Sequence, residues 1–332
     1  MGIIRYLTLM LIVARLFDMN MTANQMTFRE LLDRFADEDA CKRFLVQRRW
    51  PDGVIRCPRC REKAYTLKAR PFHYLCKSGK ESMNKETGEV TVCQKKNGYR
   101  FSVITRTVFE NTNIKLRDWF KVIFLMFHSK KGMSALQIHR MLGTGSYETA
   151  WFMCHRIRAA MKGDVIGPLE GEVEVDETYI GGRNRFRHAN KRTISARGGH
   201  DKMPVIGAIA RKGNVVCQAL SDGIGFDTLA DFVSHTVSPN VKLLATDEAF
   251  GYRHLREQGY EHQTVNHGHK QYVVGKVHTN TIENFWSLLK RGILGSYHHV
   301  SSDYLPLYVN EFAFRFNNRK NPDIFEAILA GC

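Results

Sequence analysis

The 332-residue sequence lacks the features that mark several specialised classes of protein. It has no internal repeat and no low-complexity segment, which argues against a repeat array and against a disordered tail. Its one long apolar stretch, "MGIIRYLTLMLIVARLF", is interrupted by Arg15 and is too short to span a membrane. No small-residue cleavage site follows, so we expect residues 1–26 to be an over-extended N-terminus rather than a targeting segment. We therefore expect a cytoplasmic protein with no membrane partner.

Acidic residues are scarce relative to basic ones. The chain has 33 Asp and Glu against 49 Lys and Arg, which gives a formal net charge of +16. Such an excess favours an anionic partner, with nucleic acid ahead of a membrane surface. An excess of basic residues alone is weak evidence for DNA binding, since many soluble proteins are basic without binding DNA.

Cysteines are few and unevenly placed: four of the eight lie between residues 57 and 93. This favours a local metal site in a reducing compartment over a disulfide framework. Cys57 and Cys60 form a knuckle that lets two thiolates face one Zn²⁺, and Cys76 and Cys93 would complete a structural tetrahedral set. Two alternatives remain: His73 supplies one ligand instead of Cys76 or Cys93, or the CxxC pair binds nothing.

The spacing of the two later cysteines is irregular for a zinc ribbon. Sixteen residues separate Cys76 from Cys93, whereas a usual ribbon has two tight pairs. The intervening sequence is polar at first and strand-like at "EVTV". We therefore predict a protruding excursion that returns by a strand to deliver Cys93.

Hydrophobic periodicity divides the rest of the chain into regions. A helical pattern with a capping box at Thr27 predicts a helix over 27–50. The turn-rich, cysteine-bearing segment 51–110 is the predicted zinc ribbon, and 111–165 is predicted to be helical. Alternation with a period of two begins near residue 170, so 170–320 is predicted to be an α/β domain that ends in an amphipathic helix.

The helical region contains a possible DNA-binding element. Two predicted helices over 134–161, joined by a Gly-containing turn, have the outline of a helix-turn-helix. The second helix carries Arg156 and Arg158, which we expect to contact DNA. An unrelated helical hairpin with a solvated basic face is the alternative.

Three carboxylates mark a possible catalytic site. Asp176 ends an alternating strand, Asp247 directly follows an apolar strand, and Glu283 lies on an amphipathic helix. Acidic side chains at the ends of neighbouring strands and on a packing helix can converge. Such a site can hold two Mg²⁺ or Mn²⁺ ions roughly 4 Å apart that clamp a phosphodiester. Each acid taken alone is better explained as a surface residue.

A basic loop follows the first of these carboxylates. Residues 181–192, "GGRNRFRHANKR", contain five Arg or Lys in twelve positions next to Asp176. We favour DNA contacts through Arg183 and Arg185 over a flexible basic loop without a ligand.

Several motifs together resemble those of one family. They are "RWPDGVIRCPRC", "FSVITRTVFENTNIKLRDWF", "TAWFMCHRIRAAM", "EVEVDETYIGG", "ATDEAFGY" and "HTNTIENFWSLLKRGILGSYHHVS". They resemble DDE-type insertion-sequence transposases of the ISXO-like group, which carry an N-terminal zinc ribbon, and span roughly residues 28–318. The resemblance implies an α/β, ribonuclease-H-like mixed sheet with flanking helices, preceded by a small zinc ribbon and a helical DNA-binding region.

The resemblance also implies roles for individual residues. Asp176, Asp247 and Glu283 would be the metal-binding triad. Lys290 lies two turns after Glu283 on the same helix face and would reach transposon-end phosphate, with Arg291 beside it. Asn280 is the alternative third catalytic residue, because some relatives have asparagine there.

The function implied is a transposase that binds the ends of its own insertion sequence and cleaves and transfers DNA strands. Its partners would be double-stranded DNA, at the transposon ends and at the target, and further copies of itself in a dimer or larger complex. A plain metal-dependent nuclease of the same fold is one alternative. A catalytically silent zinc-ribbon DNA-binding protein is another, although three intact acids argue against it.

Overall fold

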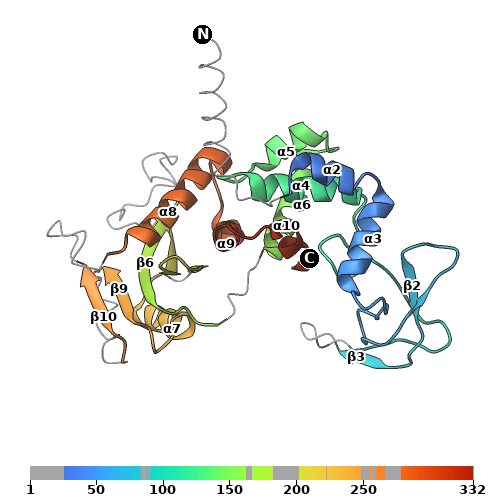
Figure 1. Cartoon of the computed structure of the whole chain (residues 1–332), viewed down its shortest axis with the longest axis horizontal. Helices are drawn as coiled ribbons and strands as arrows, with labels where there is room; N and C mark the ends of the chain where they lie inside the picture. Colours follow the sequence, from blue (N-terminus) through green and yellow to red (C-terminus); the bar gives the residue numbers. More distant parts are fainter. Residues whose placement is uncertain are drawn as a thin grey trace, which may run out of the picture. The chain divides into compact units, whose positions relative to one another are not determined.

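The computed structural model describes residues 26–83, 88, 90–161, 167–181, 202–221, 223–247, 255, 259–265 and 278–331. The chain forms two compact units (Figure 1). One comprises Met1–Leu125 together with Phe325–Cys332, and the other comprises Met126–Ile324. Within the described residues, no helix is long and apolar enough to cross a membrane.

Helices pack around an aromatic core in the first unit. The predicted capping box is confirmed, because Thr27 accepts a bond from the backbone of Glu30, whose carboxylate accepts the Thr27 backbone N–H at 2.7 Å. Phe35 and Phe120 pack edge to face in the core, with ring centroids 4.7 Å apart. The helices are α2 (Phe28–Arg34), α3 (Glu38–Arg49), α4 (Leu116–His128) and α10 (Ile324–Ala330); α4 and α10 include the points where the two units divide.

Small antiparallel sheets lie between α3 and α4. Strands β1 (Tyr65–Thr66), β2 (His73–Cys76) and β5 (Tyr99–Ser102) pair in the order β1-β2-β5, and β3 (Glu81–Met83) pairs with β4 (Val90–Val92). Trp50, Tyr74 and Phe101 pack together as a small core. Strand β4 leads directly into Cys93, which confirms the predicted return by a strand.

A five-stranded mixed sheet forms the centre of the second unit. Its strands are β6 (Glu172–Ile180), β7 (Met203–Ala210), β8 (Val215–Ala219), β9 (Leu243–Asp247) and β10 (His262–Val265). The order is β10-β9-β6-β7-β8. The first three strands along the chain are antiparallel, whereas β9 runs parallel to β6 and β10 parallel to β9. The predicted mixed sheet with flanking helices is confirmed.

The two faces of this sheet build separate cores. Helix α7 (Phe226–Thr236) packs on one face, against Val173 and Val175 of β6. Helices α8 (Asn280–Gly292) and α9 (Leu305–Asn317) pack on the other face. Because side chains alternate along a strand, the residues of β6 that alternate with those valines, Glu174 and Asp176, face α8. The position of α8 beside β6 (Figure 1) therefore decides what the acidic residues of that strand contact.

The predicted pair of helices in the second unit is present. Helix α5 (Ala135–Leu142) is capped by Ser134, and α6 (Tyr147–Ala160) is capped by Ser146. Gly143 ends α5 in the left-handed conformation, with a φ of 62°, which glycine adopts without steric cost.

Candidate catalytic and zinc sites

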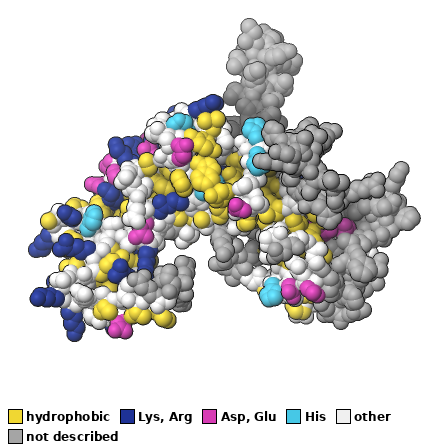
Figure 2. Space-filling view, turned by 180° about the vertical axis from the view of Figure 1, so that it is seen from behind, with side chains coloured by type: hydrophobic (Ala, Val, Ile, Leu, Met, Phe, Trp, Pro, Cys, Tyr) yellow, Lys and Arg dark blue, Asp and Glu magenta, His cyan; other side chains and the backbone are white. Residues whose placement is uncertain are grey.

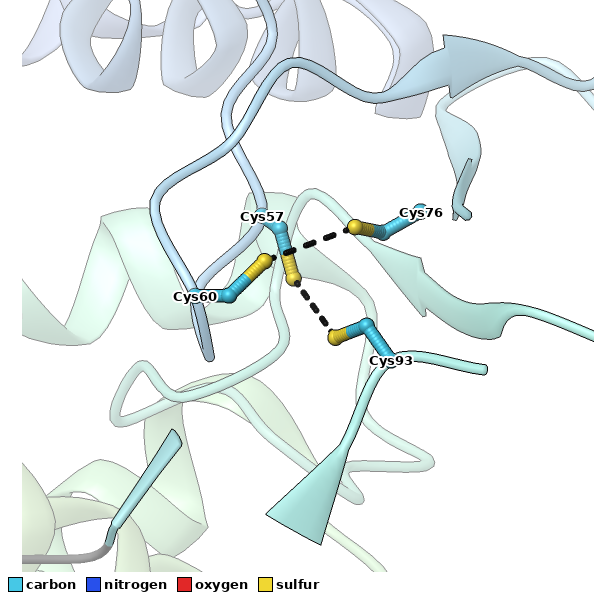
Figure 3. Close-up of side chains that lie close together, drawn as sticks. All are labelled: Cys57, Cys60, Cys76 and Cys93. Carbon is cyan, nitrogen blue, oxygen red and sulfur yellow. Dashed lines mark hydrogen bonds between the residues drawn. The ribbon is translucent and has the colours of Figure 1, made fainter. Parts of the chain in front are cut away.

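Four thiols converge in the small sheets of the first unit (Figure 3). The sulfur atoms of Cys57, Cys60, Cys76 and Cys93 all lie within 4.8 Å of one another. The Sγ atoms of Cys57 and Cys93 are 3.8 Å apart, and those of Cys60 and Cys76 are 3.5 Å apart. Tetrahedral zinc with Zn–S bonds of about 2.3 Å places its sulfurs about 3.8 Å from one another. The thiols therefore fit a structural zinc ion.

Two backbone hydrogen bonds help to position these sulfurs. In the first, the N–H of Arg61 donates to the carbonyl of Cys57 at 2.9 Å. In the second, the N–H of Gly79 donates to the carbonyl of Cys93 at 2.7 Å, so the hairpin of β3 and β4 closes the long gap and places Cys93 near Cys76. His73 is not in the group: its exposed ring lies 3.0 Å from the carbonyl of Pro71.

The pKa of one thiol, that of Cys60, is lowered. Burial by itself would raise the pKa of Cys60, but hydrogen bonds from Ser78, from the backbone of Glu62 and from Cys76 lower it to about 7. The thiolate is the form that binds metal, so a lowered pKa favours the ligand state at neutral pH.

Asp176 lies on β6 and faces α8. The indole Nε1 of Trp286 donates a hydrogen bond of 3.0 Å to its Oδ2. The partner of Asp176 on β7 is Gly207, where a Cβ would lie 2.7 Å from Cη2 of Trp286. Glycine at this position is what lets the indole reach the carboxylate.

Asp247 is the last residue of β9, the strand parallel to β6. Glu174 pairs with Ala245, so the same register carried two residues further places Asp176 level with Asp247. Burial, with the charges of Glu177 and Asp247, raises the pKa of Asp176 to about 7. Crowded carboxylates of this kind are oxygen ligands suited to Mg²⁺ or Mn²⁺, whose charge would relieve their repulsion. The two acids thus fit a divalent cation.

Glu283 lies in the first turn of α8, where its Oε1 accepts a hydrogen bond of 2.8 Å from the hydroxyl of Thr279. Its side chain is exposed, as is that of Asn280. Among the described residues, only the four cysteines form a group of three or more ligands within 4.8 Å. The sheet register therefore brings Asp176 and Asp247 together. The ligand atoms of these two acids and of Glu283 do not all lie within 4.8 Å of one another.

The predicted DNA-contacting residues fall into different environments. Lys290 and Arg291 are exposed in the last turn of α8, and Nε of Arg291 donates to the carbonyl of Ser287 at 3.1 Å. Arg156 is half-buried on α6. Arg183 and Arg185 lie outside the described residues.

The structure corrects the interpretation of Arg158. Its side chain is in the interior, 1% exposed, and its Nε donates to Oε2 of the fully buried Glu311 at 2.7 Å. Arg158 is thus a core residue and is not on the surface where DNA could reach it. The sequence holds a signal for this, because Arg158 is four residues after the buried Cys154 and continues the apolar stripe of α6.

Positive charge gathers on the small sheets around the thiols. Figure 2 shows Lys and Arg side chains there, at the lower left. The exposed members of this ribbon surface are Arg56, Arg61, Lys63, Lys68, Arg70, Lys77, Lys80, Lys95, Lys96 and Arg100. Only a few acids accompany them in the part of the ribbon that the structure describes, which therefore presents a surface suited to phosphates.

Sequence reasoning missed three residues around the carboxylates. Glu174, Gly207 and Trp286 all contact α8 or belong to it. The signal for Glu174 is its place two residues before Asp176, which puts both acids on the same face of β6. Gly207 and Trp286 carry no comparable signal, because their contact joins segments far apart in the sequence.

Two family models match separate regions of this chain, and a known protein matches most of its length. Residues 36–80 match the transposase zinc-ribbon domain, and residues 168–317 match the ISXO2-like transposase domain. An uncharacterized protein in transposable element ISH50 of Halobacterium salinarum is 30% identical over 299 residues, which cover 85% of this chain and 91% of that protein. No solved structure matches the chain. The chain belongs to the ISXO2-like transposase family.

Proposed function

We propose that this protein is a DDE-type transposase that binds the ends of its own insertion sequence and catalyses metal-dependent cleavage and transfer of DNA strands. The observation that carries the proposal is the level placement of Asp176 and Asp247 on adjacent parallel strands. Burial, together with the charges of Glu177 and Asp247, raises the pKa of Asp176, as expected for a carboxylate at a crowded, enclosed site. Membership of the transposase family supports the same conclusion.

The catalytic unit is, in this proposal, ribonuclease-H-like. The support is the strand order, in which three antiparallel strands are followed by two strands parallel to the first. Asp176, Asp247 and Glu283 would hold Mg²⁺ or Mn²⁺. Bound cations would supply Lewis-acid activation of the attacking oxygen and of the phosphodiester.

The remaining residues would bind DNA and keep the protein folded. Lys290, seven residues after Glu283, shares its helix face and would contact a phosphate of the transposon end. The four cysteines would hold structural Zn²⁺ and so maintain the basic ribbon surface. Strand transfer at two ends would require two or more copies of the chain in the DNA complex, acting in the cytoplasm.

Substitution of the acids tests the proposal. Asp176→Asn, Asp247→Asn and Glu283→Gln should each abolish cleavage of end DNA in Mg²⁺ while leaving binding of that DNA within about threefold of wild type. Asn280→Ala tests whether Asn280, rather than Glu283, is the third metal ligand. Robust cleavage by Glu283→Gln together with loss in Asn280→Ala would transfer that role to Asn280.

The assay also separates the alternatives. A plain nuclease would hydrolyse end DNA and never join the freed 3′ end to a target, whereas the proposed transposase performs both steps. A silent DNA-binding protein would bind the ends and cleave nothing, and the wild-type protein would then behave as the Asp176→Asn variant does.

A further inference from the structure

A buried carboxylate caps the helix that carries Glu283. Glu174 is fully buried on β6, yet its Oε2 accepts the backbone N–H groups of Thr281 at 2.8 Å and of Ile282 at 3.0 Å. Its Oε1 accepts the Thr281 hydroxyl at 2.9 Å. The cap residue Thr279 makes no side-chain capping bond. The free N–H groups at the start of α8 are therefore satisfied by a residue that lies 107 positions earlier.

Arg211 connects this carboxylate to His278, two residues before the helix begins. Its Nε donates to Oε1 of Glu174 at 2.7 Å, and its Nη1 donates to Oε2 of Glu172 at 2.6 Å. Its Nη2 donates to the backbone carbonyl of His278 at 3.0 Å. A planar guanidinium with fixed donor directions can hold three such acceptors in one arrangement, which a lysine cannot do.

Glu174 is unsuited to be a metal ligand, although it lies only two residues from Asp176. Donors occupy both of its oxygens, and Nδ1 of His278 lies 3.1 Å from Oε1. These positively polarised groups would repel a cation. Buried ion pairs are in general weak sources of stability compared with well-packed apolar residues, so the network points to a role in fixing geometry.

Two residues on the same face of β6 thus hold α8 through hydrogen bonds. Glu174 holds its first turn, and Asp176 accepts the Trp286 indole one and a half turns later. Ile282 and Phe285 pack on the sheet between these points. These contacts oppose sliding or tilting of the helix relative to the strand.

We propose that Glu174 and Arg211 are positioning residues that fix the start of α8, and so hold Glu283 in place relative to Asp176. The consequence for catalysis rests on the proposed function, whereas the effect on the helix does not. A displacement of about 1 Å in a catalytic group can reduce a rate by about a hundredfold, so loss of this fastening should be visible in catalysis.

Two variants of the full chain test the proposal, and a third is their matched control. Glu174→Gln keeps the shape but places an amide NH₂ against groups that donate. Arg211→Met removes the guanidinium. Arg158→Met is the control, because Arg158 also donates from Nε to a fully buried glutamate at 2.7 Å but joins α6 to α9. If Glu174→Gln does not fold, Thr281→Val removes one of the bonds at lower cost.

Hydrogen exchange over residues 280–286 measures the helix directly. After correction for each variant's change in global stability, we expect exchange to accelerate at least about tenfold in Glu174→Gln and Arg211→Met and to stay within about threefold of wild type in Arg158→Met. Wild-type protection of this turn in folded Glu174→Gln, or equal acceleration in the control, would overturn the proposal. This result does not depend on whether the protein cleaves DNA.

Cleavage kinetics measure the consequence for the site. We expect a drop of about 10- to 100-fold in single-turnover cleavage and a higher half-saturating Mg²⁺ concentration, with the Kd for end DNA unchanged. A merely destabilised protein would lose active fraction without a change in Mg²⁺ dependence. A loosened α8 with wild-type rate and Mg²⁺ dependence would contradict the catalytic role of the two residues. Failure of the proposed function would show separately, as wild-type protein that does not cleave.

Discussion

Trp286 and Asp176 form a hydrogen bond of 3.0 Å that joins α8 to the centre of the sheet. The indole reaches the carboxylate because β7 places a glycine, Gly207, opposite Asp176. An aromatic N–H that stabilises a carboxylate also orients it, so the ring fixes one candidate metal ligand while its bulk packs in the core. This contact makes Trp286 part of the proposed catalytic site as well as of the fold.

Replacing the indole separates these two roles. Trp286→Phe keeps most of the apolar packing but removes the donor to Asp176, which should cost about 1–3 kcal/mol of unfolding free energy. Gly207→Ala should cost about 1–3 kcal/mol through crowding of the ring. Urea unfolding measures both, and cleavage of end DNA should fall in each variant. Full activity in folded Trp286→Phe would show that the donor does not orient Asp176 for catalysis.

The raised pKa of Asp176 predicts a pH dependence of stability. Its pKa rises from 3.8 to about 7, so the folded protein resists deprotonation and loses stability as pH increases between these values. Asp176→Asn removes this cost, and without divalent cations it should exceed wild type by about 2–4 kcal/mol at pH 8, with little difference below pH 4.

Divalent cations should offset the same cost. Because protons and Mg²⁺ compete for the carboxylate, Mg²⁺ should raise the wild-type melting temperature more at pH 8 than at pH 6. The Asp176→Asn variant should show a smaller shift at both values. An equal response of the two proteins would mean that Mg²⁺ binds elsewhere.

The zinc ligands can be identified by metal analysis of single variants. Wild type should contain about one zinc per chain, and Cys93→Ser should lose most of it, because the four sulfurs form one tetrahedral group. His73→Ala should keep its zinc, as should the control Cys41→Ser, which changes a buried thiol outside the group. Full occupancy in Cys93→Ser with loss in His73→Ala would reverse the assignment.

Local patterns in the sequence were sufficient to predict much of the fold. The return strand before Cys93 follows from the alternation in "EVTV", and the capping box at Thr27 follows from two residues three apart. The amphipathic pattern around Glu283 predicts helix α8. The structure buries Ile282, Phe285, Trp286 and Leu289 and leaves Leu288 partly exposed. The periodicity predicts the helix. It does not predict that Trp286 faces inward, because that orientation depends on Gly207 on another strand.

What the sequence could not show are contacts between distant segments. No pattern near Thr279 indicates that Glu174 caps α8, because the cap comes from another strand. Charge was also a poor guide to exposure, since Arg158 and Glu311 are both buried. A charged residue on an apolar stripe becomes interpretable only when its partner on another helix is known.

Lys290 should contribute one phosphate contact to DNA binding. Lys290→Ala should weaken binding of end DNA and lower the slope of log Kd against log salt by about one. Lys320→Ala, another exposed lysine of the same unit, is the matched control and should leave the slope unchanged. If both variants give the wild-type slope, Lys290 is a solvated helix end and the phosphate contact lies elsewhere.

The buried pair of Arg158 and Glu311 gives a prediction about stability that also tests the corrected role of Arg158. Glu311 accepts bonds from Arg158 at 2.7 Å and from Tyr297 at 3.0 Å, and Nη2 of Arg315 lies 3.5 Å away. Glu311→Gln leaves two cations without their anion, so it should cost about 3–5 kcal/mol of unfolding free energy.

Arg158→Met should cost less than this, because Glu311 keeps Arg315 and Tyr297 as partners. The double variant should be more stable than the sum of the two single effects predicts, since no charge of the pair is then left buried alone. Denaturant unfolding of all four proteins gives this coupling. Folded Arg158→Met should also bind end DNA with the wild-type salt slope, because a guanidinium in the core neutralises no phosphate. A slope reduced by about one, with stability unchanged, would instead place Arg158 on the DNA.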